Sequence, residues 1–242
     1  MIKANISPLH EAIFRPYIRW LLKKQFHAIQ VLGEVPDFGE RSTLLLPNHS
    51  TWWDGFFIHI LKVQEFRRQT FLMMLEEQLS KNRFFSRVGA YSIDTQSFRG
   101  NLESIKYTRE LLSSAENPVV CVFPQGVLLP WSVRPLGYKR GTDFITRKLE
   151  HPINICQLAV KCEYLEHQRA DVFVQFGNCR IVEPGDRLDI ASLEHEHEQL
   201  LDELNKRVIQ GEKGRLVLRG KRSINDSFEA FQKKLGFLRG ES

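Results

Sequence analysis

Short apolar runs alternate with segments of helical periodicity along most of this chain. Strand-like runs are predicted at residues 42–46, 70–75, 88–94, 118–123, 153–164 and 171–182. Helices are predicted at 8–30, 54–64, 76–83, 101–113, 142–149 and 193–209. This alternation favours an α/β layered domain. We expect a central mixed, mostly parallel sheet flanked by helices, with the continuously apolar run 118–123 as a central strand buried on both faces.

A chain of 242 residues can bury the core of one such domain with a small appendage. We assign the α/β domain to residues 41–209. Residues 1–40 are predicted to be an amphipathic helical segment, and residues 210–242 a basic tail with an amphipathic helix around Phe228, Phe231 and Leu235. Within the domain, Asn101 is expected to cap the helix 101–113, and Glu103 falls in its favourable first turn.

The N-terminal segment interleaves aromatic and basic residues at helical spacing. Tyr17 and Trp20 lie among Arg15, Arg19 and Lys23. Rings and cations on a segment too short to span a bilayer are typical of an interfacial membrane helix. An amphipathic helix that simply packs against the core would show a similar pattern, so both interpretations stay open. The high aromatic content of the chain, 11% with 17 Phe, suggests that some rings face lipid or an apolar substrate.

Charge and targeting signals point to a membrane surface on the inside of the cell. The net charge is +5 and the pI about 9.0, which fits an anionic membrane or nucleic acid. The basic residues follow amphipathic helices and form no nucleic-acid-binding motif, so no nucleic-acid partner is expected. No signal peptide and no apolar run near the ~20 residues of a membrane span are present. We therefore expect a cytoplasmic protein, peripheral on the cytoplasmic face of the membrane.

Residues 48–55 place a His and an Asp five positions apart, directly after an apolar strand and before a helix. A His is the usual proton acceptor near neutral pH, and an Asp bonded to its other nitrogen fixes the tautomer. His49 and Asp54 are therefore candidate catalytic residues, although such a pair can also be structural. No Ser or Cys sits in a Gly-rich elbow, so the proton would come from the substrate. The four cysteines show no CxxC pair or regular spacing with His, and no metal site is predicted.

Four blocks of this sequence resemble the glycerolipid acyltransferases, the superfamily that includes lysophosphatidic acid acyltransferase. The first is Asn48-His49, four residues, then Asp54; Phe123-Pro124-Gln125-Gly126 resembles their third block, Phe-Pro-Glu-Gly. Residues 89–94 resemble the second block, and residues 158–160 fall where the fourth lies. The order and separations also fit, so the resemblance covers about residues 40–180.

The resemblance implies an acyltransferase of phospholipid biosynthesis, with residues 41–209 as its catalytic domain. His49, assisted by Asp54, would deprotonate an acceptor hydroxyl that attacks the thioester of acyl-CoA or acyl-carrier protein. No cofactor, metal or acyl-enzyme is implied, and the expected partners are membrane lipid and the acyl carrier. Residues expected at the substrates are Asn48, Asp94, Arg99, Pro124, Gln125, Gly126 and Arg134. Backbone donors near Gly126 are candidates for the oxyanion.

The departures from the family pattern concern the acceptor. Where the family has Thr-Arg-Ser after the third block, this chain has Val127-Leu128-Leu129; Thr95 replaces a second Arg, and Gln125 replaces a Glu. A phosphate without Arg partners binds poorly. Arg99 and Arg134 are candidate substitutes, and the acceptor need not be lysophosphatidate. A lipid-binding protein of the same fold and a thioester hydrolase stay open as alternatives, and acyl-chain length, carrier and oligomeric state are not determined by the sequence.

Overall fold

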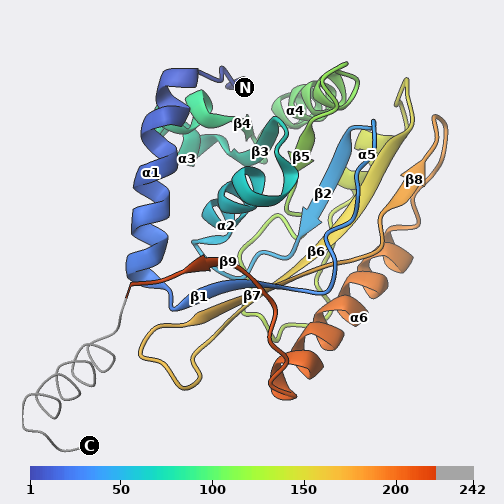
Figure 1. The fold of residues 1–242 in the computed structure, drawn as a ribbon. Coiled ribbons are helices and arrows are strands. Elements are labelled where there is room, and N and C mark those ends of the chain that lie inside the picture. Colours follow the sequence, from blue (N-terminus) through green and yellow to red (C-terminus); the bar gives the residue numbers. More distant parts are fainter. Residues whose placement is uncertain (222–242) are drawn as a thin grey trace, which may run out of the picture.

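A nine-stranded sheet forms the centre of the computed structural model, which describes residues 1–221 (Figure 1). The strand order is β4-β3-β5-β2-β6-β7-β1-β9, and β8 pairs with β6. In chain order the elements are α1 (Pro8–Gln25), β1 (Ala28–Leu32), β2 (Thr43–Pro47), α2 (Asp54–Leu61), the π-helix η1 (Lys62–Phe66), β3 (Thr70–Leu75), α3 (Glu76–Lys81), the 3₁₀-helix η2 (Arg83–Val88), β4 (Ala90–Ile93), α4 (Phe98–Leu112), β5 (Val119–Cys121), α5 (Gly141–Thr146), β6 (Ile153–Glu163), β7 (Asp171–Phe176), β8 (Arg180–Val182), α6 (Ile190–Ile209) and β9 (Arg215–Arg219).

The sheet is mixed and mostly parallel, as predicted. β2 pairs in parallel with β5 and β6, β3 with β4 and β5, and β1 with β7. Antiparallel pairs join β6 to β7 and β8, and β1 to β9. Every residue of β2 and β5 is buried, which confirms that the run 118–123 supplies a central strand covered on both faces.

Helices cover both faces of the sheet and bury two apolar layers. On one face, Phe14, Ile18 and Leu22 of α1 pack with α2 against the sheet. On the other face, Ile105 of α4 and Leu201 of α6 belong to the second layer, together with side chains of α5. Within residues 1–221, none of the helices is both long and apolar enough to cross a membrane.

Two strands, β1 and β9, were not predicted, because residues 28–32 were assigned to a helix and residues 215–219 to a basic tail. The helix predicted over 8–30 ends at Gln25, and Ala28–Leu32 forms β1 instead. Both faces of β1 are buried, so its apolar residues do not alternate and periodicity cannot separate strand from helix. β9 arises from the predicted basic tail and pairs with β1. The segments 1–40 and 210–242 thus both contribute a strand to the sheet of the predicted catalytic segment.

Two further details differ from the prediction. Asn101 is not the cap of α4, because the helix begins at Phe98 and the Ser97 hydroxyl accepts the Gly100 N–H at 3.1 Å. The strand predicted over 171–182 is interrupted after Phe176 and resumes as β8. The amphipathic helix predicted around Phe228, Phe231 and Leu235 lies outside the described residues.

Candidate active site

The loop between β2 and α2 is fixed to the neighbouring strand β6 by Asn48. The Asn48 side chain accepts the Val160 N–H at 2.7 Å and donates to the Val160 carbonyl at 3.0 Å. Asn48 is 3% exposed, and these two bonds extend the ladder beyond Pro47. Asn48 therefore holds the loop in place, and the next residue, His49, leaves the strand in a fixed direction.

His49 and Asp54 are in direct contact, as the spacing predicted. His49 Nδ1 donates to Asp54 Oδ2 at 2.8 Å. The Ser50 and Thr51 amides donate to the same oxygen at 2.8 and 2.9 Å, and the Thr51 hydroxyl donates to Oδ1 at 2.7 Å. Four donors thus compensate for the burial of a carboxylate that is 1% exposed.

This arrangement sets the tautomer of His49. Because Nδ1 carries the proton shared with Asp54, Nε2 is left as the acceptor. The His49 side chain is 26% exposed, so the acceptor nitrogen belongs to a ring that a substrate can reach. The roles of Ser50 and Thr51 as donors to Asp54 were not predicted from the sequence. The sequence feature that could have indicated these roles is a Thr three residues before Asp54, at the start of a helix.

The strand end of β5 supports His49 from its other side. The ring of Phe123 stacks on the His49 ring, with centroids 4.3 Å apart and planes at 23°. Gln125 is 3% exposed, and its Oε1 accepts the His49 backbone N–H at 2.6 Å. β2 and β5 are parallel neighbours, so their carboxyl ends meet at one edge of the sheet, as expected for the first and third blocks.

The segment after Gly126 folds back over this site and brings Lys139, a cation not predicted from the sequence, beside Gly126. The Leu129 N–H donates to the His49 carbonyl at 3.0 Å, and the Lys139 N–H donates to the Pro124 carbonyl at 2.8 Å. A Cβ on Gly126 would lie 3.4 Å from Cγ of Lys139. The exposed Lys139 side chain therefore runs alongside Gly126. The Gly126 N–H donates to the Phe123 carbonyl at 3.1 Å, whereas the Val127 N–H makes no hydrogen bond within residues 1–221.

Three other residues predicted at the substrates have bonding partners other than this pair. Asp94 accepts the Gln96 N–H at 3.0 Å. Arg99 is 91% exposed and pairs with Glu103. Arg134 donates to the Trp131 and Val133 carbonyls and pairs with Asp202 at 3.2 Å. In the part of the chain that the structure describes, none of the three is hydrogen-bonded or ion-paired with His49 or Asp54.

A band of aromatic rings leads from the His49 loop to α1. Trp52 is 68% exposed and contacts Phe56 with centroids 5.0 Å apart. Phe56 contacts Phe85, Phe85 contacts Phe84, and Phe84 contacts Phe14 of α1, with centroids 5.5–6.1 Å apart. Several of the 17 Phe residues therefore belong to this one band of contacting rings.

Helix α1 has an inward face and an exposed apolar stripe. One face packs inward through Phe14, Ile18 and Leu22. A second stripe, which we call the outer stripe, is 46–67% exposed and consists of Leu9, Ile13, Tyr17 and Trp20. The spacing of three or four residues places these side chains on one side of the helix. The helix thus caps the core and still presents an apolar surface to the outside.

The sequence matches a known protein family, and the fold resembles that of a solved structure. Residues 23–160, more than half of the chain, match the family model described as Acyltransferase. The structure resembles the crystal structure of the 1-acyl-sn-glycerophosphate (LPA) acyltransferase PlsC from Thermotoga maritima. The TM-score is 0.51 at 16% sequence identity, over 86% of this chain and 80% of that chain. At that identity the likeness concerns the fold. No curated protein matches the sequence.

Proposed function

Because this chain belongs to the acyltransferase family, we propose that it transfers a fatty acyl group from acyl-CoA or acyl-carrier protein to a hydroxyl of a lipid acceptor. The observation that carries the proposal is the 2.8 Å hydrogen bond from His49 Nδ1 to Asp54. Asp54 is buried, and its carboxylate accepts hydrogen bonds from four donors. The hydrogen bond from Nδ1 leaves Nε2 of a partly exposed ring as a proton acceptor at a strand end.

In the proposed reaction, Nε2 of His49 takes the proton of the acceptor hydroxyl. The hydroxyl oxygen attacks the thioester carbonyl, and the electron pair of the C=O bond moves to its oxygen. When the C–S bond breaks, the thiolate leaves and takes the proton from the His49 imidazolium, so the products are an ester and a free thiol. Asp54 stabilises the imidazolium between the two steps. The Val127 N–H, which makes no hydrogen bond within residues 1–221, is our candidate donor to the oxyanion.

We propose that the acceptor is approached from a membrane surface, with the protein peripheral on the cytoplasmic face. The outer stripe of α1 and the exposed Trp52 offer apolar groups for the headgroup boundary. The exposed Arg15 and Arg19 would meet anionic lipid. The aromatic band connects this surface with the loop that carries His49.

For the acceptor headgroup, Lys139 is our candidate cation in place of the Arg residues of the family pattern. Lys139 lies beside Gly126, while Arg99 and Arg134 are paired elsewhere. A single Lys binds phosphate as a point charge without the bidentate geometry of Arg. Next to it, Val127 and Leu128 are each 50% exposed. We therefore propose a hydroxylated lipid other than lysophosphatidate as the preferred acceptor.

The test is an assay of free thiol and ester with a long-chain acyl-CoA and a panel of lipid acceptors. We expect His49→Ala to lower kcat by about 10²–10⁴-fold, the range of general base catalysis. His151→Ala, at an exposed His in a turn, is the matched control and should leave the rate unchanged. Equal rates for wild type and His49→Ala would exclude His49 as the base.

Product analysis separates the proposal from its alternatives. An ester that accumulates with the free thiol supports acyl transfer, whereas free fatty acid without ester indicates a hydrolase. Vesicle binding without turnover of any acceptor indicates a lipid-binding protein. A wide preference for lysophosphatidate would contradict the acceptor proposed from the missing Arg residues.

A further inference from the structure

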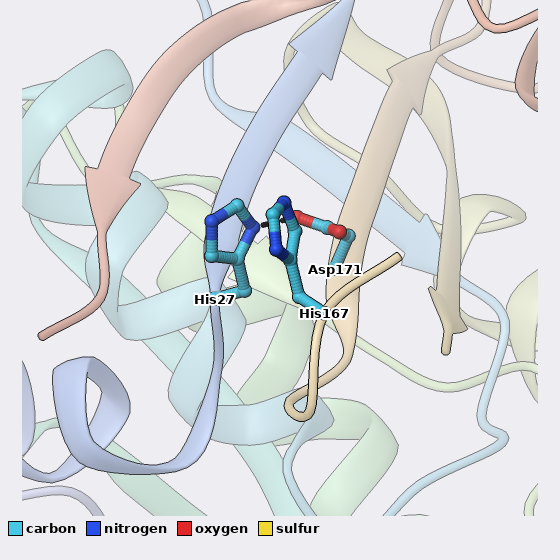
Figure 2. Close-up of side chains that lie close together, drawn as sticks. All are labelled: His27, His167 and Asp171. Carbon is cyan, nitrogen blue, oxygen red and sulfur yellow. Dashed lines mark hydrogen bonds and ion pairs between the residues drawn. The ribbon is translucent and has the colours of Figure 1, made fainter. Parts of the chain in front are cut away.

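Two histidines and an aspartate meet at the junction of α1 and β1. His27 directly precedes β1, Asp171 is the first residue of β7, and His167 belongs to the connection between β6 and β7. His27 Nδ1 donates to Asp171 Oδ1 at 2.9 Å. The His27 and His167 rings lie 3.4 Å apart between centroids, and all three side chains point toward one another (Figure 2).

The main chain fixes two of these residues independently of their side chains. Ala28 is paired with Asp171 in the parallel ladder of β1 and β7. The His27 N–H donates to the Ala170 carbonyl at 2.9 Å, and the Gly220 N–H donates to the His27 carbonyl at 2.7 Å. Asp171 is 5% exposed. The nitrogen of His27 and the carboxylate of Asp171 are thus held close together by the sheet.

His167 differs from these two, because within residues 1–221 its ring makes no side-chain hydrogen bond. It offers an uncommitted nitrogen to the pair. One ligand atom from each of the three residues lies within 4.8 Å of the others. Imidazole nitrogen and carboxylate oxygen are ligands that zinc binds in proteins. We propose that His27, His167 and Asp171 bind one zinc ion.

Binding needs the ligand atoms to move closer together and the His167 ring to leave its stack on His27, because an imidazole nitrogen binds a metal in the plane of its ring. A tetrahedral zinc ion with bonds of roughly 2.0–2.1 Å separates its ligand atoms by about 3.4 Å. The half-buried His167 lies between the exposed residues Glu166 and Gln168, so rotation of its side chain supplies this movement. The metal replaces the proton that His27 shares with Asp171. Since His27 and His167 are only partly buried, water can take the fourth position.

The nearest cation in sequence does not occupy the cluster. Arg169 donates to the Lys23 and Lys24 carbonyls at 3.0 and 3.2 Å and also to the Lys221 carbonyl. Its charge is therefore directed at the end of α1. The same bonds already tie the β6–β7 connection to that helix. A bound zinc ion would add a second link at the base of α1 and would stabilise the fold without taking part in acyl transfer.

The experiment measures zinc binding to the full-length protein after chelator treatment and buffer exchange. We expect one Zn²⁺ per chain by isothermal titration. At a Zn²⁺ concentration about 100 times Kd, we expect a rise in Tm of roughly 5–10 °C. His167→Ala, His27→Ala and Asp171→Asn should each weaken binding by at least about tenfold. His151→Ala, at an exposed His outside the cluster, should bind as the wild type does.

His167→Ala is the deciding variant, because it removes no contact of the sheet and should fold even if Asp171→Asn does not. Wild-type protein without a Zn²⁺ isotherm or Tm shift would overturn the proposal. Zinc binding of equal affinity in wild type and His167→Ala would overturn it as well. Neither readout depends on acyl transfer, so failure of the zinc site and failure of the proposed function are distinguishable.

Discussion

At the scale of single residues, Gln125 is the departure from the family pattern that the structure explains. Its Oε1 accepts the His49 backbone N–H at 2.6 Å, at a position 3% exposed. A Glu oxygen could accept the same bond, since both side chains place an acceptor at the same distance from the backbone. The Gln makes this bond without burying a charge, which is costly. Gln125 is therefore compatible with an active site that has kept its geometry.

We predict that Gln125→Glu retains catalysis within about tenfold, whereas Gln125→Leu loses more and is also less stable. The Leu variant leaves the His49 N–H without its acceptor, which costs about 1–3 kcal/mol for a buried donor. Thiol release gives the rate, and urea unfolding gives the stability. Gln210→Leu, at an exposed Gln after α6, controls for the exchange of amide for alkyl. If Gln125→Leu behaved like that control, the bond to His49 would be unimportant.

Lys139 is the residue at which the acceptor charge can be tested. We predict that Lys139→Met raises KM for acceptors with an anionic headgroup and leaves KM for neutral acceptors within about twofold, because only the former lose a charge-assisted contact. Steady-state kinetics with matched acceptors measure this difference. Lys148→Met, at an exposed Lys after α5, is the control. An equal effect on both acceptor classes would indicate a packing role for the Lys139 stem.

At the scale of elements, the sequence identified what depends on local pattern and missed what depends on distant partners. β3 begins and ends at the predicted residues, Thr70 and Leu75. The contact of His49 with Asp54 follows from a short loop between a strand and a helix. β1 and β9 were missed, because their strand character comes from pairing with each other and with β7. Lys139 was missed as well, because a long loop without periodicity gives no indication of where it folds back.

Helix α1 packs on the core through one face, and the membrane-interface role of its outer stripe stays a prediction. We predict that the double variant Ile13→Ser with Trp20→Ser weakens binding to anionic vesicles by at least about tenfold, since each side chain loses a burial contribution of about 1.5–3 kcal/mol. The fold should be little affected, because these side chains are 57% and 46% exposed. Vesicle sedimentation measures the binding. Ile181→Ser on β8, at an equally exposed Ile, should bind as the wild type does.

At the scale of the whole molecule, each of the two packed layers contains one buried histidine that folding keeps neutral. Burial, with Lys62 and Arg15 nearby, lowers the pKa of His59 in α2 to about 3. Burial lowers the pKa of His197 in α6 to about 4, against the opposing effect of its bond to the Leu158 carbonyl. His197 Nε2 donates to that carbonyl at 3.1 Å, so Nδ1 accepts the Tyr138 hydroxyl at 2.5 Å. Protonation of Nδ1 would leave the Tyr138 hydroxyl proton without its acceptor in this link between α6 and the loop that carries Lys139.

We therefore predict that the protein loses stability as the pH falls from 7 to 5. An unfolded His binds a proton near pH 6.5, whereas His59 and His197 in the folded state do so only near pH 3 and 4. Between these values the unfolded state holds more protons, so the free energy of unfolding falls by roughly 2 kcal/mol per residue at pH 5. Urea unfolding at pH 7 and pH 5 measures this loss. His197→Gln should reduce it by about half, and His151→Gln, at an exposed His, should leave it unchanged. A His197→Gln protein with the full pH dependence would show that acid acts through other groups.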